Sequence, residues 1–237
     1  MRILRKQALV AGVVVAAALG LAPLTASAEP IDISGDASGL TVQVDVLGTP
    51  INVGPLPIVT APPGGNQQVV GADVPGVASA DVLGVSSQPT ATGVDSAAQV
   101  AGAEVLGGVV SAGVLTATCS STPDGSAGGA ALVDASVLGT PVDVSPPANT
   151  QVPLPGLGAV YLNEQVRSDA PGSSSMTVNA VRVALTGGLT LGGITISHAS
   201  CSATDLGIVP GGATVSGPGG GGAPVATAVT ASPAFTG

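Results

Sequence analysis

Alternating apolar and polar residues dominate the second half of this chain of 237 residues. Between Met176 and Leu185 the even-numbered positions of an extended chain would share one face, and the odd-numbered positions the other. The Gly187-Gly188 pair interrupts this run, and β-branched residues resume around Ile194 and continue to Cys201. The pattern predicts a β-hairpin, or two sequential strands, closed by a cysteine.

Runs of the same kind recur along the chain, separated by glycine and proline. No stretch outside residues 1–28 keeps a helical period of apolar residues. Proline lacks the amide donor of a sheet ladder, so the segments Pro55–Pro63 and Pro146–Pro155 are not expected in central strands. The sequence therefore predicts an all-β fold. The further expected strands are Leu40–Val46, Ala98–Val105, Val109–Thr118, Ala131–Val137, Ala159–Glu164 and Leu189–Ser200.

The chain contains an internal duplication. The sequence V-L-G-T-P occurs at Val46–Pro50 and again at Val137–Pro141. Each copy is followed by P-L-P, then by a Gly-Gly pair, and then by A-T-C-S or A-S-C-S. We therefore expect two sequence-related halves, at about residues 36–121 and 124–205. Two units are too few for a solenoid, so the halves should face each other or interleave in a sandwich-like fold.

Cys119 and Cys201 are the only cysteines, and they occupy matching places in the two halves. In an exported protein this arrangement predicts a disulfide between them. The alternative is a pair of free, buried thiols, which would leave the halves as two small domains without a covalent link.

Three motifs carry a resemblance to a known family: Gly156–Gln165 (G-L-G-A-V-Y-L-N-E-Q), Thr177–Val183 (T-V-N-A-V-R-V) and Ala199–Ser202 (A-S-C-S). With these motifs the chain resembles the "choice-of-anchor P" proteins of actinobacteria over about residues 36–205. The resemblance implies an exported all-β protein whose C-terminal attachment to the cell varies among relatives. It brings no catalytic residues.

The composition of the chain divides it into three segments. Residues 1–28 have the basic start, the apolar stretch and the A-S-A site of a signal peptide, and we expect no stable membrane span after its removal. Residues 29–209 are expected to form the β-sandwich-like domain. Residues 210–237, rich in Gly, Pro, Ala and Thr, are expected to form a flexible, disordered tail. These features predict a secreted, extracellular protein, with association with the cell wall as an alternative.

Charge and aromatic content restrict the partners. The chain has 5 Lys and Arg against 14 Asp and Glu; three of the basic residues lie within residues 1–28, which leaves 2 − 14 = −12 after removal of that segment. Nucleic-acid binding requires cationic side chains to replace counterions, so a nucleic-acid partner is not expected. One Tyr, one Phe and no Trp leave the core to aliphatic side chains. The expected partner is an unidentified cell-surface or extracellular molecule.

Candidate catalytic groups are few. His198 is the only histidine, and its spacing from Cys201 resembles half of a metal site, but positions three apart on a strand point to opposite faces. No G-x-S-x-G motif or EF-hand-type loop is present. We therefore assign no catalytic, cofactor-binding or metal-binding residue and expect a structural or binding protein, not an enzyme. The alternatives are a secreted hydrolase that uses His198 or a carboxylate pair, and a self-assembling surface coat.

One stretch has the residues of a recognition surface. On an extended strand Tyr161, Asn163 and Gln165 share one face, and Leu162 and Glu164 share the other. The first interpretation is a polar recognition strip made of Tyr161, Asn163 and Gln165. The second, which we favour, is structural: Asn163 and Gln165 hydrogen-bond a neighbouring turn, while Glu164 pairs with Arg167 or Arg182.

Overall fold

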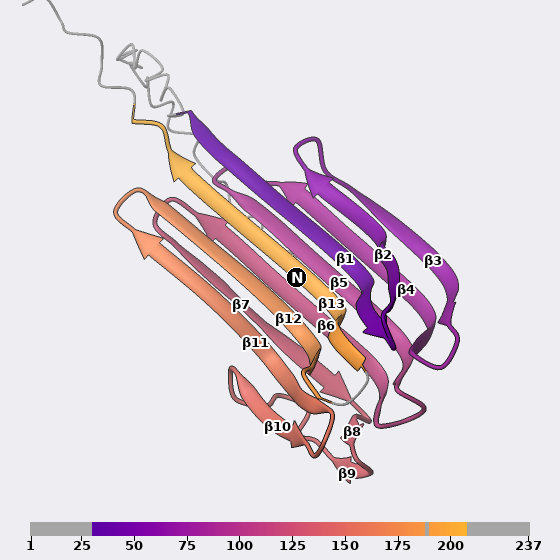
Figure 1. Ribbon diagram of the computed structural model, residues 1–237. Coiled ribbons are helices and arrows are strands. Elements are labelled where there is room, and N and C mark those ends of the chain that lie inside the picture. Colours follow the sequence, from indigo (N-terminus) through magenta and orange to yellow (C-terminus); the bar gives the residue numbers. More distant parts are fainter. Residues whose placement is uncertain (1–29, 188–189, 208–237) are drawn as a thin grey trace, which may run out of the picture.

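A computed structural model describes residues 30–187 and 190–207. They form two antiparallel β-sheets packed face to face, as Figure 1 shows, so the predicted all-β sandwich is confirmed. The described part of the chain contains no helix long and apolar enough to cross a membrane. The predicted signal peptide (1–28) and tail (210–237) lie outside the described residues.

The six-stranded sheet has the first and last described strands, β1 and β13, paired with each other in its interior. In spatial order its strands are β10 (Thr150–Leu154), β11 (Gly158–Ala170), β12 (Ser173–Leu185), β13 (Thr190–Asp205), β1 (Ile31–Val46) and β2 (Thr49–Ala61).

The seven-stranded sheet consists of β3 (Gly65–Val74), β4 (Ala78–Pro89), β5 (Val94–Val105), β6 (Val110–Thr122), β8 (Ser136–Val137) and β9 (Thr140–Pro141), with β7 (Gly125–Val133) also paired to β6.

The two sequence halves interleave. Strands β3 to β6 of the first half continue into β7, β8 and β9 of the second, while β10 to β13 of the second half continue into β1 and β2 of the first. Each sheet therefore contains four strands of one half and the opening strands of the other. Neither half forms a closed sheet layer of its own.

Equivalent turns support the equivalence of the halves. Both V-L-G-T-P copies are two-residue hairpin turns with positive φ at both central residues: 55° and 81° at Leu47 and Gly48, and 52° and 73° at Leu138 and Gly139. These angles are those of a type I′ turn, whose twist matches that of the paired strands. Two further hairpins, β3–β4 and β10–β11, each turn on a Pro-Gly pair.

The proline-rich segments lie at the edges of the six-stranded sheet. Pro55 and Pro57 belong to β2 and Pro153 to β10, the two outermost strands of this sheet. An edge strand tolerates proline because the missing donor faces away from the ladder. The sequence analysis missed β2, β3, β4 and β10 as strands, because their prolines, glycines and glutamines break the apolar alternation. The expected hairpin of β12 and β13 is confirmed.

The strict alternation expected between Met176 and Leu185 is wrong. In β12 the even-numbered residues up to Ala180 are buried, whereas from Val181 to Leu185 the odd-numbered residues are buried. The inward-facing set therefore changes in the middle of the strand.

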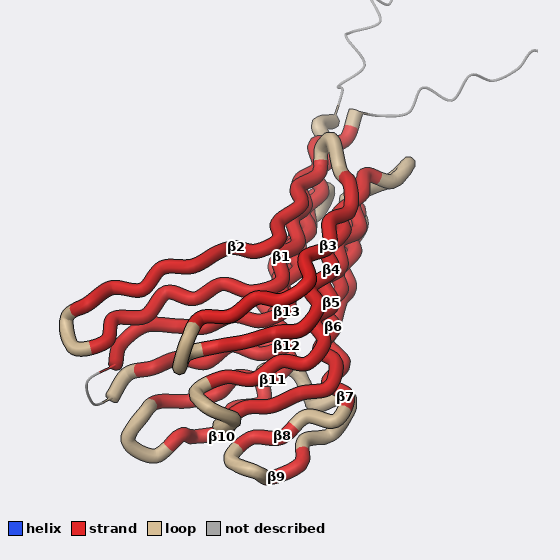
Figure 2. Tube along the Cα trace, turned by 90° about the vertical axis from the view of Figure 1, so that its right-hand side faces the viewer, coloured by secondary structure: helices blue, strands red, loops and turns tan. Residues whose placement is uncertain are grey.

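Neighbouring strands make the same change at the same level. In β13 it occurs at Ser197 and in β11 at Asn163, residues with positive φ of 58° and 49°. In the seven-stranded sheet Gly71 and Gly102 have positive φ at the corresponding change in β3 and β5. A positive φ rotates the following peptides and so exchanges the two faces of a strand. Figure 2 shows that the strands change direction between the two ends of the sandwich.

The two ends of the sandwich differ in the side chains and bonds that lie between the two sheets. At the cysteine end, defined as the part around Cys119 and Cys201, the disulfide joins β6 to β13 with 6.0 Å between Cα atoms, where packed sheets usually lie about 10 Å apart. The hydroxyl of Ser197 donates to the carbonyl of Ala98 in the other sheet at 2.8 Å, and a Cβ at Gly35 would lie 2.6 Å from Val94.

The opposite end, here called the leucine end, has turns that carry Leu47, Leu106, Leu138 and Leu157. Toward this end larger side chains fill the interior. Burial of each such side chain contributes about 1.5–3 kcal/mol. Fully buried examples are Leu40, Leu115, Leu132, Leu162, Ile194 and Ile196.

Candidate functional site

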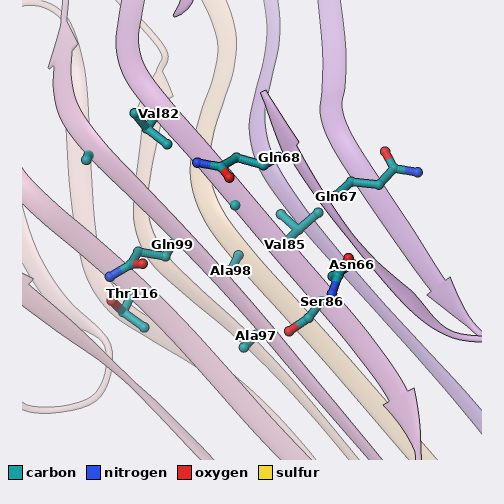
Figure 3. A pocket seen from close by; sticks show the side chains of 12 residues that line it. Asn66, Gln67, Gln68, Val82, Val85, Ser86, Ala97, Ala98, Gln99 and Thr116 are labelled. Carbon is teal, nitrogen blue, oxygen red and sulfur yellow. The ribbon is translucent and has the colours of Figure 1, made fainter. Parts of the chain in front are cut away.

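A hollow of about 680 Å³ crosses β3, β4, β5 and β6 on the outer face of the seven-stranded sheet (Figure 3). None of its lining residues is charged, and small residues of β4 and β5 form much of its floor. We call it the glutamine groove. Its polar side chains are those of Asn66, Gln68, Ser86, Gln99 and Thr116, whereas the side chain of Gln67, which pairs with Val85, points away from the groove.

Strand register builds the centre of the glutamine groove. Gln68 pairs with Gly84, Gly84 with Gln99, and Gln99 with Thr116, so these residues form one row across four strands. Gly84 therefore leaves a gap between two amide side chains. A Cβ placed at Gly84 would meet no atom within 4 Å, so the gap is open to solvent.

The glutamine groove can form hydrogen bonds but not ion pairs. A glutamine amide offers two donors and an acceptor, and a threonine hydroxyl offers one donor and accepts as well. An ionic ligand would lose hydration here without gaining an opposite charge. The groove therefore suits an uncharged ligand with several hydroxyl or amide groups.

The outer face of the other sheet carries a chain of polar side chains across four strands. Nδ2 of Asn179 donates to Glu164 at 2.8 Å, and Oδ1 of Asn179 lies 2.7 Å from Nδ1 of His198. Nε2 of His198 lies 3.1 Å from the carboxylate of Asp36. Strands β11, β12, β13 and β1 each contribute one of these side chains, which we call the polar network.

Arg182 closes the polar network at its other end. Its guanidinium binds Glu164 through two nitrogens, with distances of 2.6–2.8 Å, and lies 4.3 Å from the ring centre of Tyr161. Burial raises the pKa of Glu164, but the hydrogen bonds from Arg182 and Asn179 and the charge of Arg182 together lower it below its usual value. In the opposite direction, the hydrogen bond to Glu164 raises the pKa of Arg182 above its usual value.

The contacts of His198 in the described structure are with acceptor oxygens. Both of its ring nitrogens face an acceptor oxygen, on Asn179 and on Asp36. Among the hydrogen bonds of the described residues, none joins the imidazole to a hydroxyl or a thiol. A general base must reach the proton that it removes, so this geometry matches structural pairing more closely than a hydrolase triad.

The recognition strip expected at Tyr161, Asn163 and Gln165 does not share one face. Tyr161 lies under Arg182 on the outer face, whereas Asn163 turns inward at its positive φ and is only 7% exposed. Asn163 accepts from the amide of Ala130 at 3.0 Å and donates to the carbonyl of Pro146 at 2.8 Å. The second interpretation is observed for Asn163, which bonds a neighbouring turn, and for Glu164, which pairs with Arg182, whereas the side chain of Gln165 donates to Asn163 at 2.8 Å and not to a turn.

The predicted disulfide between Cys119 and Cys201 is present, and neither thiol is free. His198 lies on the outer face of β13 and Cys201 on the buried face, so the two do not form half of a metal site. Within residues 30–187 and 190–207, no group of three or more His, Cys, Asp or Glu side chains is arranged to hold a metal ion.

Three acidic residues border a hollow elsewhere on the surface. Asp81, Glu104 and Asp134 line an open hollow of about 480 Å³ on the outer face of the seven-stranded sheet. Sequence spacing does not show this proximity, because the three residues come from separate strands and a loop.

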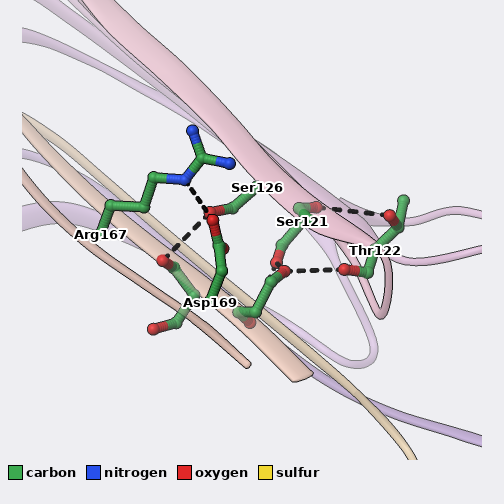
Figure 4. Close-up of polar contacts among 8 residues, drawn as sticks. Ser121, Thr122, Ser126, Arg167 and Asp169 are labelled. Carbon is green, nitrogen blue, oxygen red and sulfur yellow. Dashed lines mark hydrogen bonds and ion pairs between the residues drawn. The ribbon is translucent and has the colours of Figure 1, made fainter. Parts of the chain in front are cut away.

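Serine and threonine hydroxyls join the sheets at the cysteine end (Figure 4). Ser174 donates to the carbonyl of Thr122 at 2.7 Å, and Ser126 donates to the carboxylate of Asp169 at 2.8 Å. The pKa of Asp169 lies below its usual value, first because of the bond from Ser126 and then because of Arg167, which also contacts this carboxylate. These contacts join the two sheets through polar groups at a place where several serines are buried.

Sequence analysis missed the glutamine groove. The only local signal is the uncharged N-Q-Q of β3, and Gly84 becomes a gap only when the register places it between Gln68 and Gln99. Comparisons with protein-family models, with curated proteins and with solved structures found no match for this chain.

Proposed function

We propose that the protein is a secreted or cell-surface binding module without catalytic activity, and that it binds its ligand in the glutamine groove. The observation that carries this proposal is the open gap at Gly84 between Gln68 and Gln99. Two amide groups on either side of an unfilled position form a set of donors and acceptors for a ligand that enters the gap.

The extracellular location has two supports. Disulfides persist in oxidising compartments, and the Cys119–Cys201 bridge fits such a compartment. The resemblance to exported choice-of-anchor P proteins, together with the signal-peptide pattern of residues 1–28, favours the same location.

The ligand that suits the glutamine groove best is an uncharged polysaccharide. Its hydroxyl groups match the amides and hydroxyls of the lining, and the absence of charge matches the absence of charged lining residues. The groove spans four strands, or roughly 14 Å at about 4.8 Å between neighbouring strands, which is long enough for more than one sugar ring. Aromatic stacking is absent from the lining, so we expect affinity to rise with the length of the sugar chain.

The test fills the gap and leaves the rest of the sheet unchanged. Gly84→Val places a side chain where nothing lies within 4 Å, and valine favours strands, so the variant should fold. Gly193→Val is the matched control, because Gly193 lies on the outer face of the other sheet, and a Cβ there would meet only ordinary contacts.

Binding is measured by affinity electrophoresis through gels that contain uncharged polysaccharides of glucose, galactose or mannose. We expect retardation of the natural protein and of Gly193→Val by at least one polymer, and binding at least about tenfold weaker for Gly84→Val, equivalent to about 1.4 kcal/mol. Equal retardation of both variants, or no retardation of the natural protein by any polymer, would contradict the proposal.

The contact of His198 with Asp36 is the one observation that favours the alternative, a hydrolase. A hydrolase of this kind would lose all turnover of ester, peptide or glycoside substrates in a His198→Gln variant. We expect no turnover by the natural protein in such a screen. Turnover that depends on His198 would replace our proposal by the alternative.

A further inference from the structure

Turns at the leucine end place leucine where both the backbone and the solvent disfavour it. Leu47 and Leu138 have φ of 55° and 52° and are 68% and 53% exposed. They occupy the first central position of a type I′ turn, where asparagine, aspartate and glycine are the usual residues. Leu106 has the same backbone conformation, with φ of 51°, in the β5–β6 loop.

The same arrangement occurs in both halves of the chain and therefore is not a property of one loop. Leu47 belongs to the first V-L-G-T-P copy and Leu138 to the second. Leu157, in the β10–β11 turn, and Leu191, near the start of β13, add further exposed leucines at this end. Strained residues that persist at equivalent positions point to a functional requirement.

Two apolar hollows open beside these leucines. One, of about 270 Å³, lies between Ile51, Val77 and Leu106. The other, of about 350 Å³, lies between Leu138 and Val152. The first hollow is bordered by Val46 and the second by Val137 and Leu138, so each V-L-G-T-P copy borders one apolar hollow.

The shape and the charge of this end restrict what covers it. Leu47, Leu106, Leu138 and Leu157 stand on four separate turns, so a fluid layer that adapts to each of them fits this end better than a rigid protein surface does. Neither of the cations in the described part of the chain, Arg167 and Arg182, belongs to a turn at this end, whereas Asp45 and Asp143 lie beside the two V-L-G-T-P turns. An anionic lipid surface would be repelled, and a second copy carries the same acidic charge.

We propose that the leucine end docks on a lipid surface with uncharged or zwitterionic headgroups, with the turn leucines inserted among the acyl chains. The described chain begins and ends at the cysteine end, where Leu206 bonds to Pro30, so docking leaves both of these ends free. This inference concerns a surface separate from the glutamine groove and stands independently of the proposed function.

The test exploits the strained turns. In the double variant Leu47→Asn/Leu138→Asn each new residue favours positive φ, so the fold should be at least as stable as in the natural protein. Loss of lipid binding in this variant therefore cannot result from unfolding. Leu206→Asn is the matched control, because Leu206 is 57% exposed at the cysteine end and outside any strand.

Binding of the full chain, with the N-terminal processing that its cell performs, is measured by co-sedimentation with phosphatidylcholine vesicles. We expect the double variant to bind at least tenfold more weakly than the natural protein, with an unchanged or higher unfolding midpoint, and Leu206→Asn to bind normally. Replacement of a third of the lipid by phosphatidylglycerol should weaken binding at least threefold. Absence of binding by the natural protein, or equal binding by the double variant, would overturn the proposal.

A fluorescent reporter separates lipid insertion from self-association. The chain has no tryptophan, so Leu47→Trp and Leu206→Trp each introduce a single emitter. We expect the emission of Leu47→Trp, and not that of Leu206→Trp, to shift to shorter wavelength when vesicles are added. If the shift instead follows protein concentration without vesicles, and sedimentation velocity shows dimers that the double asparagine variant lacks, the leucine end is an interface between copies and the lipid proposal is wrong.

Discussion

The cysteine end and the leucine end are built from the same two sheets, yet different interactions hold them together. At the cysteine end a disulfide and hydroxyl bonds join the sheets, and buried alanines and serines lie between them beside a few larger side chains such as Met176 and Val178. At the leucine end the interior contains leucine, isoleucine and valine, and hollows open between the turns. A covalent link is thus placed where alanine and serine make up much of the interior.

The exchange of faces in mid-strand makes this difference possible. In β13 the buried residues are Ile194 and Ile196 on one side of Ser197, and Ala199 and Cys201 on the other. A strand with strict alternation would bury one set along its whole length. Because the buried positions change at Ser197, β13 presents isoleucines to the interior toward the leucine end and smaller side chains to the interior at the cysteine end.

Removal of the disulfide, which tests the cysteine end, should cause the largest loss of stability. The bond closes a loop of 82 residues, and on the chain-entropy model its loss costs about 4–5 kcal/mol of a total stability near 5–15 kcal/mol. Cys119→Ser/Cys201→Ser should therefore lower the midpoint of urea unfolding sharply. A loss below about 1 kcal/mol would mean that packing alone holds the cysteine end.

Truncation in the apolar core should have the next largest effect. Ile194 is fully buried toward the leucine end, and Ile194→Ala should cost about 2–5 kcal/mol. Leu206→Ala, at an exposed position, should change the unfolding free energy by less than about 0.5 kcal/mol. Similar losses for the two variants would show that the interior near Ile194 is loosely packed.

A pair of glycine substitutions compares the narrow interior with an open surface. At Gly35 a new Cβ would lie 2.6 Å from Val94 and 2.8 Å from the hydroxyls of Ser87 and Ser96, so Gly35→Ala should cost about 1–3 kcal/mol. Gly84→Ala meets no atom within 4 Å and should be neutral or slightly stabilising. Equal unfolding midpoints for the two variants would indicate that the sheets can separate at the cysteine end without loss.

The smallest expected loss of stability comes from a change in the polar network, and this loss depends on pH. The folded-state pKa of Glu164 is lowered, so its charged form stabilises the fold above the unfolded-state value of about 4.3, and this contribution is lost as the pH falls through the lower folded-state pKa. Glu164→Gln should cost about 1 kcal/mol at pH 7 and almost nothing near pH 2. Glu104→Gln, at an exposed position, is the control; a penalty for Glu164→Gln that stays constant with pH would contradict the assignment.

Local signals predicted several elements correctly because the information lies within a few residues. The two V-L-G-T-P turns share one conformation, and the matching cysteines form the disulfide. The sequence also contains a signal of the reversal of faces in β12, because Ala180 and Val181 are adjacent apolar residues, which strict alternation does not explain. We overlooked it because either face of β12 could be assigned to the core.

The recognition strip and the glutamine groove show the limit of sequence interpretation. Asn163 faces inward because its φ is positive, a backbone choice that alternation of residue types does not encode. Gln68 and Gln99 meet across Gly84 only through the register of three strands. Register depends on the pairing of distant segments, so a single sequence does not determine it.

The pairing of β1 with β13 has a consequence for the order of folding. The first described strand finds its main neighbour only when the last one is available, because Ile31 pairs with Asp205 and Val46 with Thr190. Contacts between such distant residues slow folding, since a long loop must close before they form. We expect chains shortened before β13 to stay largely unfolded, and a chain that emerges N-terminus first would remain an open substrate for proteases and chaperones until its last strand has passed.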